Sequence, residues 1–252
     1  MISFPCAKIN LGLNIVSKRD DGYHNIETVF YPVRDTTDIL EIVESGQFSF
    51  TQTGLYVDSA TEDNLCVKAY RMLEKEYNLP PVSIYLHKTI PTGAGLGGGS
   101  SDASSSLVIL NTIFDLNIPN EQLKSYAAML GSDCAFFIDN VPAKASGRGE
   151  ILEPVEVDIS GLHISIVNPA GIHVSTKEAY ANITPQIPDL PVDEIIKLPV
   201  EQWKDKLCND FEKSIFPRYP QIAEIKKQMY EQGAVYASMS GSGASVFGLF
   251  SI

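Results

Sequence analysis

The feature that most constrains this chain is the stretch PTGAGLGGGSSDAS at residues 91–104, where five of the seven residues from 93 to 99 are glycine. Glycine loses more conformational freedom on folding than any other residue. A cluster of this density therefore indicates a tight turn or a close approach of another group to the backbone. Residues 100–116 follow with apolar side chains on nearly every helical face, which predicts a buried helix.

A glycine-rich turn that leads into a helix presents backbone N–H groups at the positive end of the helix dipole, and this predicts an anion site. A packing turn without a ligand is the structural alternative, but the run of Gly97 to Gly99 before two serines favours the anion site. Ser100 and Ser101 are either helix caps or ligands of a metal and phosphate. Asp102 either caps the helix or shares a Mg²⁺ ion with the phosphates.

Other phosphate-binding motifs do not fit the context of this loop. Gly93, Gly95 and Gly98 match GxGxxG, but the dinucleotide fold requires a βαβ unit, and residues 117–130 predict a second helix instead of a strand. The Walker loop needs a lysine after the glycines, and the protein-kinase motifs VAIK, HRD and DFG are absent from the sequence.

Composition narrows the class of ligand. The formal net charge of −12 disfavours a general nucleic-acid binder, so a phosphorylated small molecule would need local dipoles, a metal or a few lysines to hold it. Four scattered cysteines without a CxxC pair indicate free thiols and no zinc site. No apolar run is long enough to span a membrane, and the N-terminus indicates a first strand rather than a signal peptide, so we expect a cytoplasmic protein. The oligomeric state stays open.

Periodicity predicts a β-rich first third, followed by a helix and a strand. The strands are expected at residues 3–17, 26–33, 38–44 and 48–53, with a hairpin turn at 46–47. A helix then starts near the cap candidate Asp63 and ends before Pro80, and a strand covers residues 82–91.

The remaining chain continues to mix helices and strands. The pattern predicts helices at 120–130 and 219–233, strands at 142–148, 150–157 and 162–169, irregular chain with short helices at 185–200, and a strand–loop–strand unit at 234–250. Helices and strands are therefore mixed along the chain, and we place a boundary between two lobes near residues 150–160.

Three separated stretches resemble the GHMP small-molecule kinases. They are PCAKINLGLNIVSKRDDGYHNIETVF at 5–30, PTGAGLGGGSSDASSSL at 91–107 and SMSGSGASVFGLF at 238–250. EDNLCVKAYRML, GSDCAFFI and ASGRGEIL match in order between them, so the resemblance runs from Pro5 to Phe250. Within that superfamily, AKINL together with DGYH is similar to the 4-diphosphocytidyl-2-C-methyl-D-erythritol kinases.

The resemblance implies a two-lobe α+β fold. Residues 1–155 would form an N-terminal lobe like the second domain of ribosomal protein S5, which carries the ATP loop, and residues 156–252 a ferredoxin-like C-terminal lobe. It also implies ATP and Mg²⁺ as cofactors, and phosphoryl transfer to the 2-hydroxyl of 4-diphosphocytidyl-2-C-methyl-D-erythritol in non-mevalonate isoprenoid synthesis.

Two alternatives stay open. One is another small-alcohol kinase of the superfamily, such as a homoserine or mevalonate kinase, which would lack the paired AKINL and DGYH signals. The other is a nucleotide-binding module without catalysis, which would keep the glycine loop but lose Lys8 or Asp133.

The resemblance also implies which residues bind ATP. They are Pro91, Thr92, Gly93, Ala94, Gly95, Leu96, Gly97, Gly98, Gly99, Ser100 and Ser101. The metal ligands are left open among Ser100, Ser101 and Asp102.

Two residues are implied to be catalytic. Lys8 lies in a near-alternating strand and by pattern alone reads as a surface lysine, but the resemblance places it near the accepting hydroxyl. Asp133 by itself is a turn or cap residue, and the resemblance makes it the carboxylate that either accepts the hydroxyl proton or orients the hydroxyl. Cys134 and Ala135 follow where the family usually has Val-Pro, which leaves the shape of this loop open.

The resemblance implies that three ring-bearing side chains recognise the cytosine base. By resemblance Tyr23 stacks on the base, His24 binds its edge, and Tyr180 closes the other side in place of the more familiar Phe. Asn10 and Thr176 are expected to make further substrate contacts, although Asn10 can equally be a buried polar group of a strand.

Overall fold

The computed structural model describes residues 1–56, 60–181 and 183–252. Helices and strands are mixed along the chain, as the α+β prediction requires. The chain forms two compact units: unit 1 comprises Met1–Ala7, Pro32–Thr92 and Gly97–Val141, and unit 2 comprises Lys8–Tyr31, Gly93–Leu96 and Pro142–Ile252. Because both units are discontinuous, contact density divides the chain differently from one boundary at 155–156, and that boundary stays a prediction.

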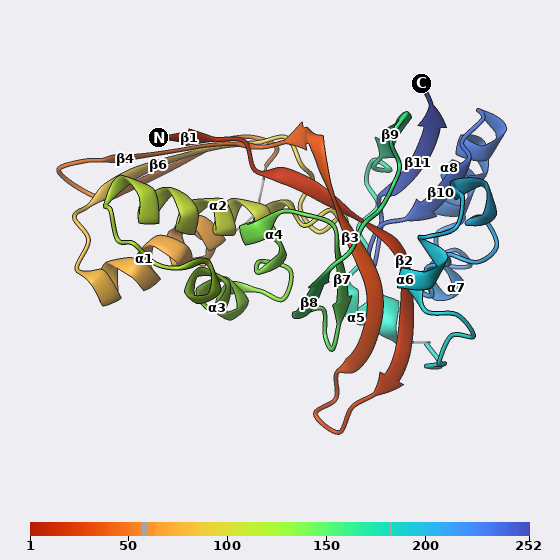
Figure 1. The fold of residues 1–252 in the computed structure, drawn as a ribbon. Coiled ribbons are helices and arrows are strands. Elements are labelled where there is room, and N and C mark those ends of the chain that lie inside the picture. The colour runs from red at the N-terminus through yellow and green to blue at the C-terminus, as the bar shows by residue number, and fades with distance from the viewer. Residues whose placement is uncertain (57–59, 182) are drawn as a thin grey trace. The chain divides into compact units, whose positions relative to one another are not determined.

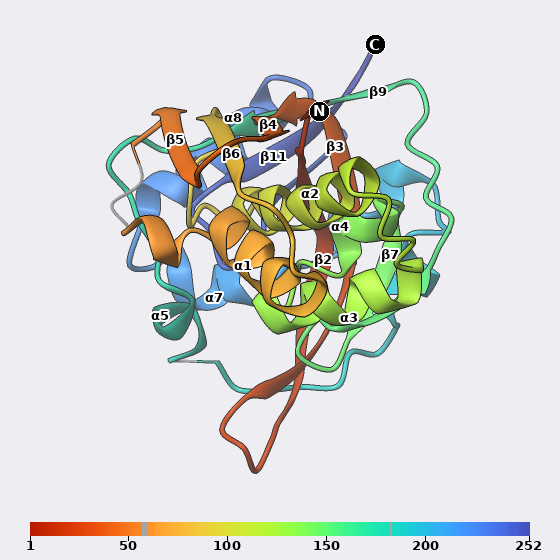
Figure 2. The ribbon, with the colours of Figure 1, turned by 90° about the vertical axis from the view of Figure 1, so that its left-hand side faces the viewer.

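Unit 1 is a four-stranded sheet with helices packed on one side (Figures 1 and 2). The strand order is β1(Ile2–Ser3)-β4(Ile39–Glu44)-β6(Val82–Lys88)-β5(Ser49–Gly54), with β5 parallel to β6 and the other pairs antiparallel. The helical elements are η1(Thr61–Asp63), α1(Leu65–Tyr77), α2(Gly98–Ile113), α3(Asn120–Leu130) and α4(Phe136–Asp139).

The core of unit 1 forms where strand alternation meets helical periodicity. On β6 the alternate residues Val82, Ile84 and Leu86 are buried, and they belong to one hydrophobic cluster with Leu107 and Leu110 of α2. Most of α2 is buried, which confirms the prediction made from its apolar faces.

Two local predictions for unit 1 are wrong. Residues 46–47 do not join a hairpin, because β6 lies between β4 and β5 and pairs with both. The β5–β6 pair is parallel and needs a long crossover, which α1 supplies. The cap of α1 is Asn64 rather than Asp63: its side chain accepts a hydrogen bond of 2.9 Å from the N–H of Cys66.

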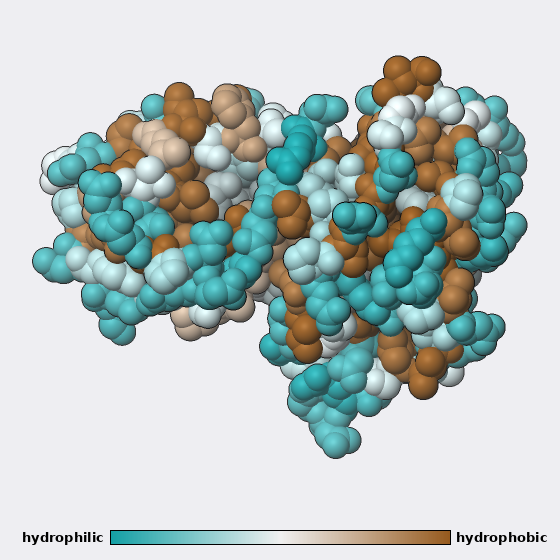
Figure 3. Space-filling model, in the orientation of Figure 1, coloured by the Kyte–Doolittle hydropathy of each residue, from teal (hydrophilic) through white to brown (hydrophobic). Residues whose placement is uncertain are grey.

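Unit 2 contains two sheets. One has the order β2(Cys6–Lys18)-β3(His24–Thr37)-β7(Ala143–Ser146)-β8(Ile151–Pro154), with the start of β2 and the end of β3 in unit 1. The tip between β2 and β3, residues 18–23, is exposed and hydrophilic (Figure 3). The other sheet is antiparallel, in the order β10(Tyr236–Met239)-β11(Val246–Ser251)-β9(Leu162–Val167).

The helices of unit 2 are mostly short: α5(Thr176–Tyr180), α6(Val192–Ile195), η2(Val200–Gln202), α7(Phe211–Ile215) and α8(Pro220–Glu231). Helix α8 packs on β10 and β11, where Ile222 and Met229 join Val246 in the core. The irregular character predicted for residues 185–200 is confirmed, since they contain one short helix and the first residue of η2. Among the residues that the structure describes, no helix is both long and apolar enough to cross a membrane.

Candidate active site

The glycine loop enters helix α2 through left-handed backbone. Gly93, Gly95 and Gly97 have φ angles of 69°, 79° and 70°, a region that side chains rarely tolerate. Gly97 is the N-cap residue of α2 and supplies no side-chain cap, and the first helical hydrogen bond runs from the N–H of Ser101 to the carbonyl of Gly97. The N–H groups of the first helical turn lack intrahelical acceptors, so they can bind an anion.

The protein's own backbone and side chains require several of these glycines. A Cβ on Gly95 would lie 1.9 Å from the carbonyl oxygen of Ser240, and one on Gly98 would lie 2.8 Å from Ile90 Cγ2. Gly99 differs, because its nearest neighbour would be Leu65 Cδ1 at 3.9 Å. Close internal packing therefore explains Gly95 and Gly98, whereas a Cβ on Gly99 would make only an ordinary van der Waals contact.

Lys8 of β2 is attached to the glycine loop within unit 2. Its Nζ donates hydrogen bonds to the carbonyl of Gly95 (3.1 Å) and to Asn10 Oδ1 (2.6 Å), and lies 4.8 Å from the centre of the Phe30 ring. Its backbone N–H donates to the carbonyl of Leu96. The side chain is 3% exposed, so it is not the surface lysine that strand alternation indicates.

Asn10 lies beside Lys8 as a buried polar residue of the strand. Its Oδ1 accepts from Lys8 and its Nδ2 donates to Thr28 Oγ1 at 3.0 Å. Of the two interpretations left open by the sequence, this geometry fits the buried polar group. A contact with substrate stays a prediction.

Asp133 lies in the turn between α3 and α4, half-buried in unit 1. The turn is attached to α2, because Ser104 Oγ donates a 2.6 Å hydrogen bond to the carbonyl of Cys134. Burial raises the pKa of the Cys134 thiol to about 11, so the thiol is neutral at pH 7 and occupies an apolar position there. The loop thus has a fixed attachment without the usual Val-Pro, and the catalytic role of Asp133 stays a prediction.

A buried ion cluster connects the two sides of the glycine loop in unit 1. Lys88, at the end of β6, forms ion pairs with Asp38 and with Asp102 of α2, the latter at 2.7 Å. Asp38 also accepts hydrogen bonds from the N–H groups of Thr89 (2.6 Å) and Ile90 (2.9 Å). The cluster therefore fixes the chain just before the loop to the first turns of the helix after it.

Asp102 is part of this cluster rather than a helix cap. It is 2% exposed, and its Oδ1 is buried without a hydrogen-bond partner among the described residues. Burial raises the pKa of Asp102 to about 7, with Lys88 opposing the rise and Asp38 adding to it. Because Lys88 holds the carboxylate in the interior, Asp102 is a poor metal ligand in this arrangement.

Lys88 and Asp38 are not among the site residues predicted from the sequence, although a signal for Lys88 exists. Val82, Ile84, Leu86 and Lys88 all occupy the inward positions of β6. A lysine that continues a buried alternation predicts a buried partner carboxylate. No local pattern identifies Asp38, because its partners are the last residue of β6 and the two residues after it, which are distant in sequence.

The predicted base-binding residues all lie in unit 2. The His24 and Tyr180 rings are stacked with centroids 4.7 Å apart, and Tyr23 is 57% exposed with the Arg148 guanidinium 5.2 Å from its ring centre. Burial, with a contribution from Lys18, lowers the pKa of His24, so its imidazole is neutral at pH 7. Tyr23 therefore offers an exposed ring for stacking, while Tyr180 packs against His24.

Thr176 lies at the first position of α5, exposed, with its hydroxyl 3.4 Å from that of Ser242. Ser242 belongs to the glycine-rich loop between β10 and β11.

In the described part of the chain, no group of three or more His, Cys, Asp or Glu side chains is arranged to hold a metal ion. Ser101 is 2% exposed and Ser100 is half-buried, so Ser100 is the more accessible of the two predicted serine ligands.

Comparisons with known proteins agree with the sequence resemblance. The family description "GHMP kinases N terminal domain" matches residues 64–148, and "GHMP kinases C terminal" matches residues 194–251. The chain is 55% identical over 254 residues to the 4-diphosphocytidyl-2-C-methyl-D-erythritol kinase of Bacteroides fragilis, covering 100% of this chain and 92% of the relative.

Solved structures give the same result. A crystal structure of a 4-(cytidine 5'-diphospho)-2C-methyl-D-erythritol kinase matches with a TM-score of 0.84 and 33% identity, covering 99% of this chain and 90% of that one. The mevalonate kinase of Methanococcus jannaschii matches with a TM-score of 0.70 but 13% identity over 99% of this chain and 90% of that one, a likeness of fold alone. The chain is a small-molecule kinase of the GHMP kinase family, and within that family it belongs to the 4-diphosphocytidyl-2-C-methyl-D-erythritol kinases.

Proposed function

We propose that this protein transfers the γ-phosphoryl group of ATP to the 2-hydroxyl of 4-diphosphocytidyl-2-C-methyl-D-erythritol, a step of non-mevalonate isoprenoid synthesis. The observation that carries the proposal is the attachment of Lys8 Nζ to the carbonyl of Gly95 in the anion-binding loop. It holds a buried cation on the loop that receives phosphates. The 55% identity to a kinase named for this substrate supports the choice of acceptor.

ATP would bind along residues 91–101, with its phosphates on the N–H groups of the first turn of α2. The absence of close contacts beside Gly99 among the described residues supports this location, because the nearest neighbour of a Cβ there would be Leu65 Cδ1 at 3.9 Å, whereas the Cβ positions of Gly95 and Gly98 are blocked by the protein itself. A Mg²⁺ ion that arrives with ATP would neutralise phosphate charge, and of the predicted ligands the Ser100 hydroxyl fits it best. Asp102 does not fit that role because it is paired with Lys88.

In the transfer step, the acceptor hydroxyl oxygen forms a bond to the γ-phosphorus, the bond to the β–γ bridging oxygen breaks, and ADP leaves. The hydroxyl proton passes to the carboxylate of Asp133, which also orients the hydroxyl. Lys8 would stabilise the negative charge that develops on the transferred group, and its burial strengthens that interaction.

The cytidine part of the substrate would be recognised in unit 2. Tyr23 would stack on the base, and neutral His24 would exchange hydrogen bonds with its edge, as its lowered pKa favours. Tyr180, Thr176 and Asn10 would complete the contacts. We further propose that the protein acts in the cytoplasm on this small molecule and not on nucleic acid, consistent with its net charge of −12.

The direct test is ADP release from purified protein with Mg-ATP, measured with and without 4-diphosphocytidyl-2-C-methyl-D-erythritol. We expect release that depends on this alcohol, and losses of roughly 10²- to 10⁴-fold in kcat for Lys8→Met and Asp133→Asn. Asp139→Asn is the matched control, because Asp139 also lies in unit 1 but is an exposed partner of Lys124. It should keep its activity within about two-fold.

Each rival function gives its own result. A nucleotide-binding module without catalysis would bind ATP but release no ADP with any alcohol. Another small-alcohol kinase would release ADP with homoserine or mevalonate and not with the cytidine substrate. Either result would overturn the proposal.

A further inference from the structure

The loop between β10 and β11 supports the glycine loop within unit 2. Ser240 Oγ donates a 2.8 Å hydrogen bond to the carbonyl of Gly95, and the N–H of Ser245 donates a 3.2 Å bond to the carbonyl of Ala94. The Gly95 carbonyl therefore accepts from both Ser240 and Lys8. The position of Ser240 consequently determines where the acceptor of the Lys8 ammonium group lies.

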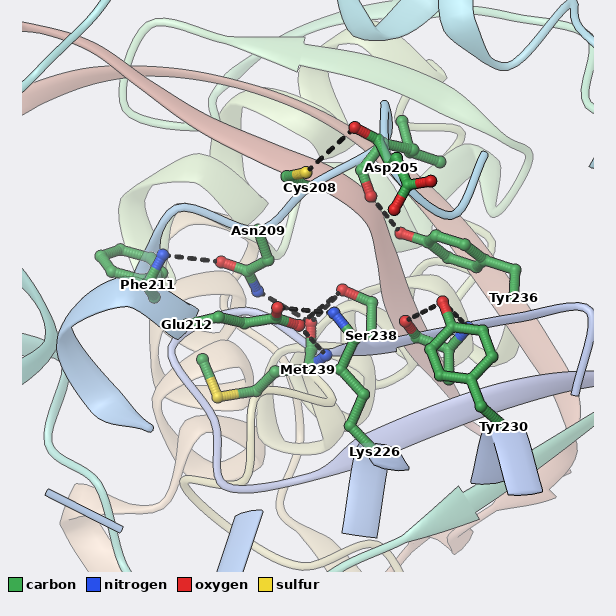
Figure 4. Close-up of polar contacts among 12 residues, drawn as sticks. Asp205, Cys208, Asn209, Phe211, Glu212, Lys226, Tyr230, Tyr236, Ser238 and Met239 are labelled. Atoms are coloured by element: carbon green, nitrogen blue, oxygen red, sulfur yellow. Dashed lines mark hydrogen bonds and ion pairs between the residues drawn. The ribbon is translucent and has the colours of Figure 1, made fainter. Parts of the chain in front are cut away.

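Asn209 holds this supporting loop through its side-chain amide. It is 1% exposed, and its Nδ2 donates a 2.8 Å hydrogen bond to the carbonyl of Met239 (Figure 4). The same Nδ2 donates a 2.9 Å bond to the carbonyl of Gly241, so it contacts both residues that flank Ser240. Its Oδ1 accepts a 3.0 Å bond from the N–H of Phe211, which fixes the orientation of the amide. One side chain thus fixes the backbone on both sides of Ser240.

Glu212, in the first turn of α7, holds the strand that leads into the loop. Its Oε1 accepts hydrogen bonds from the N–H of Met239 (2.9 Å) and from Ser238 Oγ (3.1 Å), and its Oε2 pairs with Lys226 of α8 at 2.6 Å (Figure 4). Met239 is therefore held at its N–H by Glu212 and at its carbonyl by Asn209. The sequence stretches that carry the family resemblance include neither of these two side chains.

We propose that Asn209 and Glu212 are positioning residues for phosphoryl transfer, which act by fixing Ser240 and so the Gly95 carbonyl that anchors Lys8. This inference rests on the proposed function for its kinetic readout. It assigns a catalytic consequence to a hydrogen-bond network that runs from α7 through the β10–β11 loop to the glycine loop.

The sharpest variant is Asn209→Asp, which keeps the size and the acceptor for Phe211 but replaces the amide donor with a carboxylate oxygen. The carbonyls of Met239 and Gly241 then lose their donor and face a negative charge. We expect kcat to fall about ten- to a hundred-fold, because misplacement of catalytic groups by a fraction of an ångström has effects of this size. KM for the cytidine substrate should change by about two-fold or less, because its base contacts are untouched.

Tyr236→Phe is the matched control for lost stability. Tyr236 lies on the same strand, is 1% exposed, and its hydroxyl donates a 2.7 Å bond to the carbonyl of Leu207, away from the loop. The variant loses one buried hydrogen bond as Asn209→Asp loses two, but it leaves Ser240 in place. Its melting temperature should fall while kcat stays within about two-fold of the parent protein.

Milder variants keep the test decisive if Asn209→Asp does not fold. Glu212→Gln removes the charge that pairs with Lys226, and Ser240→Ala removes only the final link to Gly95. If both act through the same loop, the double variant should lose less kcat than the product of the two single losses. Independent, multiplicative losses would contradict the proposal.

Amide hydrogen exchange tests the same hydrogen-bond network without an activity assay. Asn209→Asp or Glu212→Gln should speed exchange of the amides in residues 93–96 and 240–245, and Tyr236→Phe should not. Equal kcat and equal exchange in these segments for the Asn209, Glu212 and Tyr236 variants would overturn the inference. Failure of the proposed function looks different, because the parent protein would then release no ADP while the exchange result could still be read.

Discussion

The two ends of the glycine loop are held by different chemistry. In unit 1 the start of α2 is attached through buried charges, where Lys88 pairs with Asp102 and Asp38. In unit 2 residues 93–96 are held by hydrogen bonds between neutral groups of Ser240, Ser245 and the loop carbonyls, with Lys8 as the only charged donor described there. One end therefore depends on charge neutralisation in the interior and the other on backbone geometry.

This difference predicts different consequences of mutation. A buried ion cluster that loses its cation leaves carboxylates without compensation, so damage there should appear mainly as lost stability. A network of neutral hydrogen bonds loses about 1 kcal/mol per bond, so damage there should appear mainly as misplacement of catalytic groups.

The largest effect on stability is expected for Lys88→Met, which leaves Asp38 and Asp102 buried without a cation. The free energy of unfolding should fall by about 3–5 kcal/mol, measured by urea denaturation at pH 7. Lys124→Met is the control, because Lys124 pairs with Asp139 at a partly exposed site and should cost less than about 1 kcal/mol. Equal losses for the two variants would remove the distinction between the buried cluster and a surface pair.

The next largest effect concerns pH. The pKa of Asp102 is raised to about 7, so the folded state binds this proton more tightly than the unfolded state does. The resulting stabilisation is complete below the normal aspartate pKa and is lost as pH rises to 7. Relative to Asp102→Asn, the parent protein should lose roughly 2–4 kcal/mol between pH 4 and pH 7.5, measured by urea denaturation.

Asp193→Asn provides the control of opposite sign. Burial raises the pKa of Asp193, but the hydrogen bond and charge of Lys144 outweigh burial and lower it. Relative to this variant, the parent protein should gain stability as pH rises through the normal aspartate range. If the stability difference between parent and variant changed with pH in the same direction for Asp102→Asn and Asp193→Asn, Asp102 would not be buried and paired as described.

A smaller effect on stability, with a large one on activity, is expected for Gly95→Ala. The new Cβ would lie 1.9 Å from the carbonyl oxygen of Ser240 at a φ of 79°, so the two loops of unit 2 must separate. The free energy of unfolding should fall by about 2–3 kcal/mol and ATP binding, measured by calorimetry, should be lost.

Gly161→Ala separates backbone strain from steric conflict. Gly161 has nearly the same φ of 76°, but a Cβ there meets nothing within 4 Å. It should lose only about 1 kcal/mol and should bind ATP like the parent protein. If Gly95→Ala behaved in the same way, close approach of the β10–β11 loop would not be the reason for glycine at 95.

Local sequence patterns predicted helices and strands well where a single residue type marks the end of the element. Helix α3 begins at Asn120 and ends at Leu130 before Gly131, as expected from its periodicity and its glycine stop. The prediction of a hairpin at residues 46–47 was wrong, because local turn signals carry no information about a third strand. Here β6 inserts between β4 and β5, which are neighbours in sequence.

The candidate site also contains a part that the sequence predicts and a part that only the fold shows. The glycine loop and its helix were visible as a pattern, and the family resemblance supplied Lys8 and Asp133. The groups that hold the glycine loop were not visible in the sequence. Asp38 reaches Lys88 from the position between β3 and β4, and Asn209 reaches the residues beside Ser240 through backbone carbonyls that any sequence would supply. Contacts to backbone atoms leave no complementary residue type in the sequence, and only the fold reveals them.

Phosphorus NMR of the reaction mixture, after incubation with Mg-ATP and 4-diphosphocytidyl-2-C-methyl-D-erythritol, identifies both the product and the position of the transferred phosphate. We predict one ADP for each new phosphomonoester, with that ester on the 2-hydroxyl of the acceptor. Formation of ADP together with free phosphate, or a phosphate on a different hydroxyl, would contradict the account.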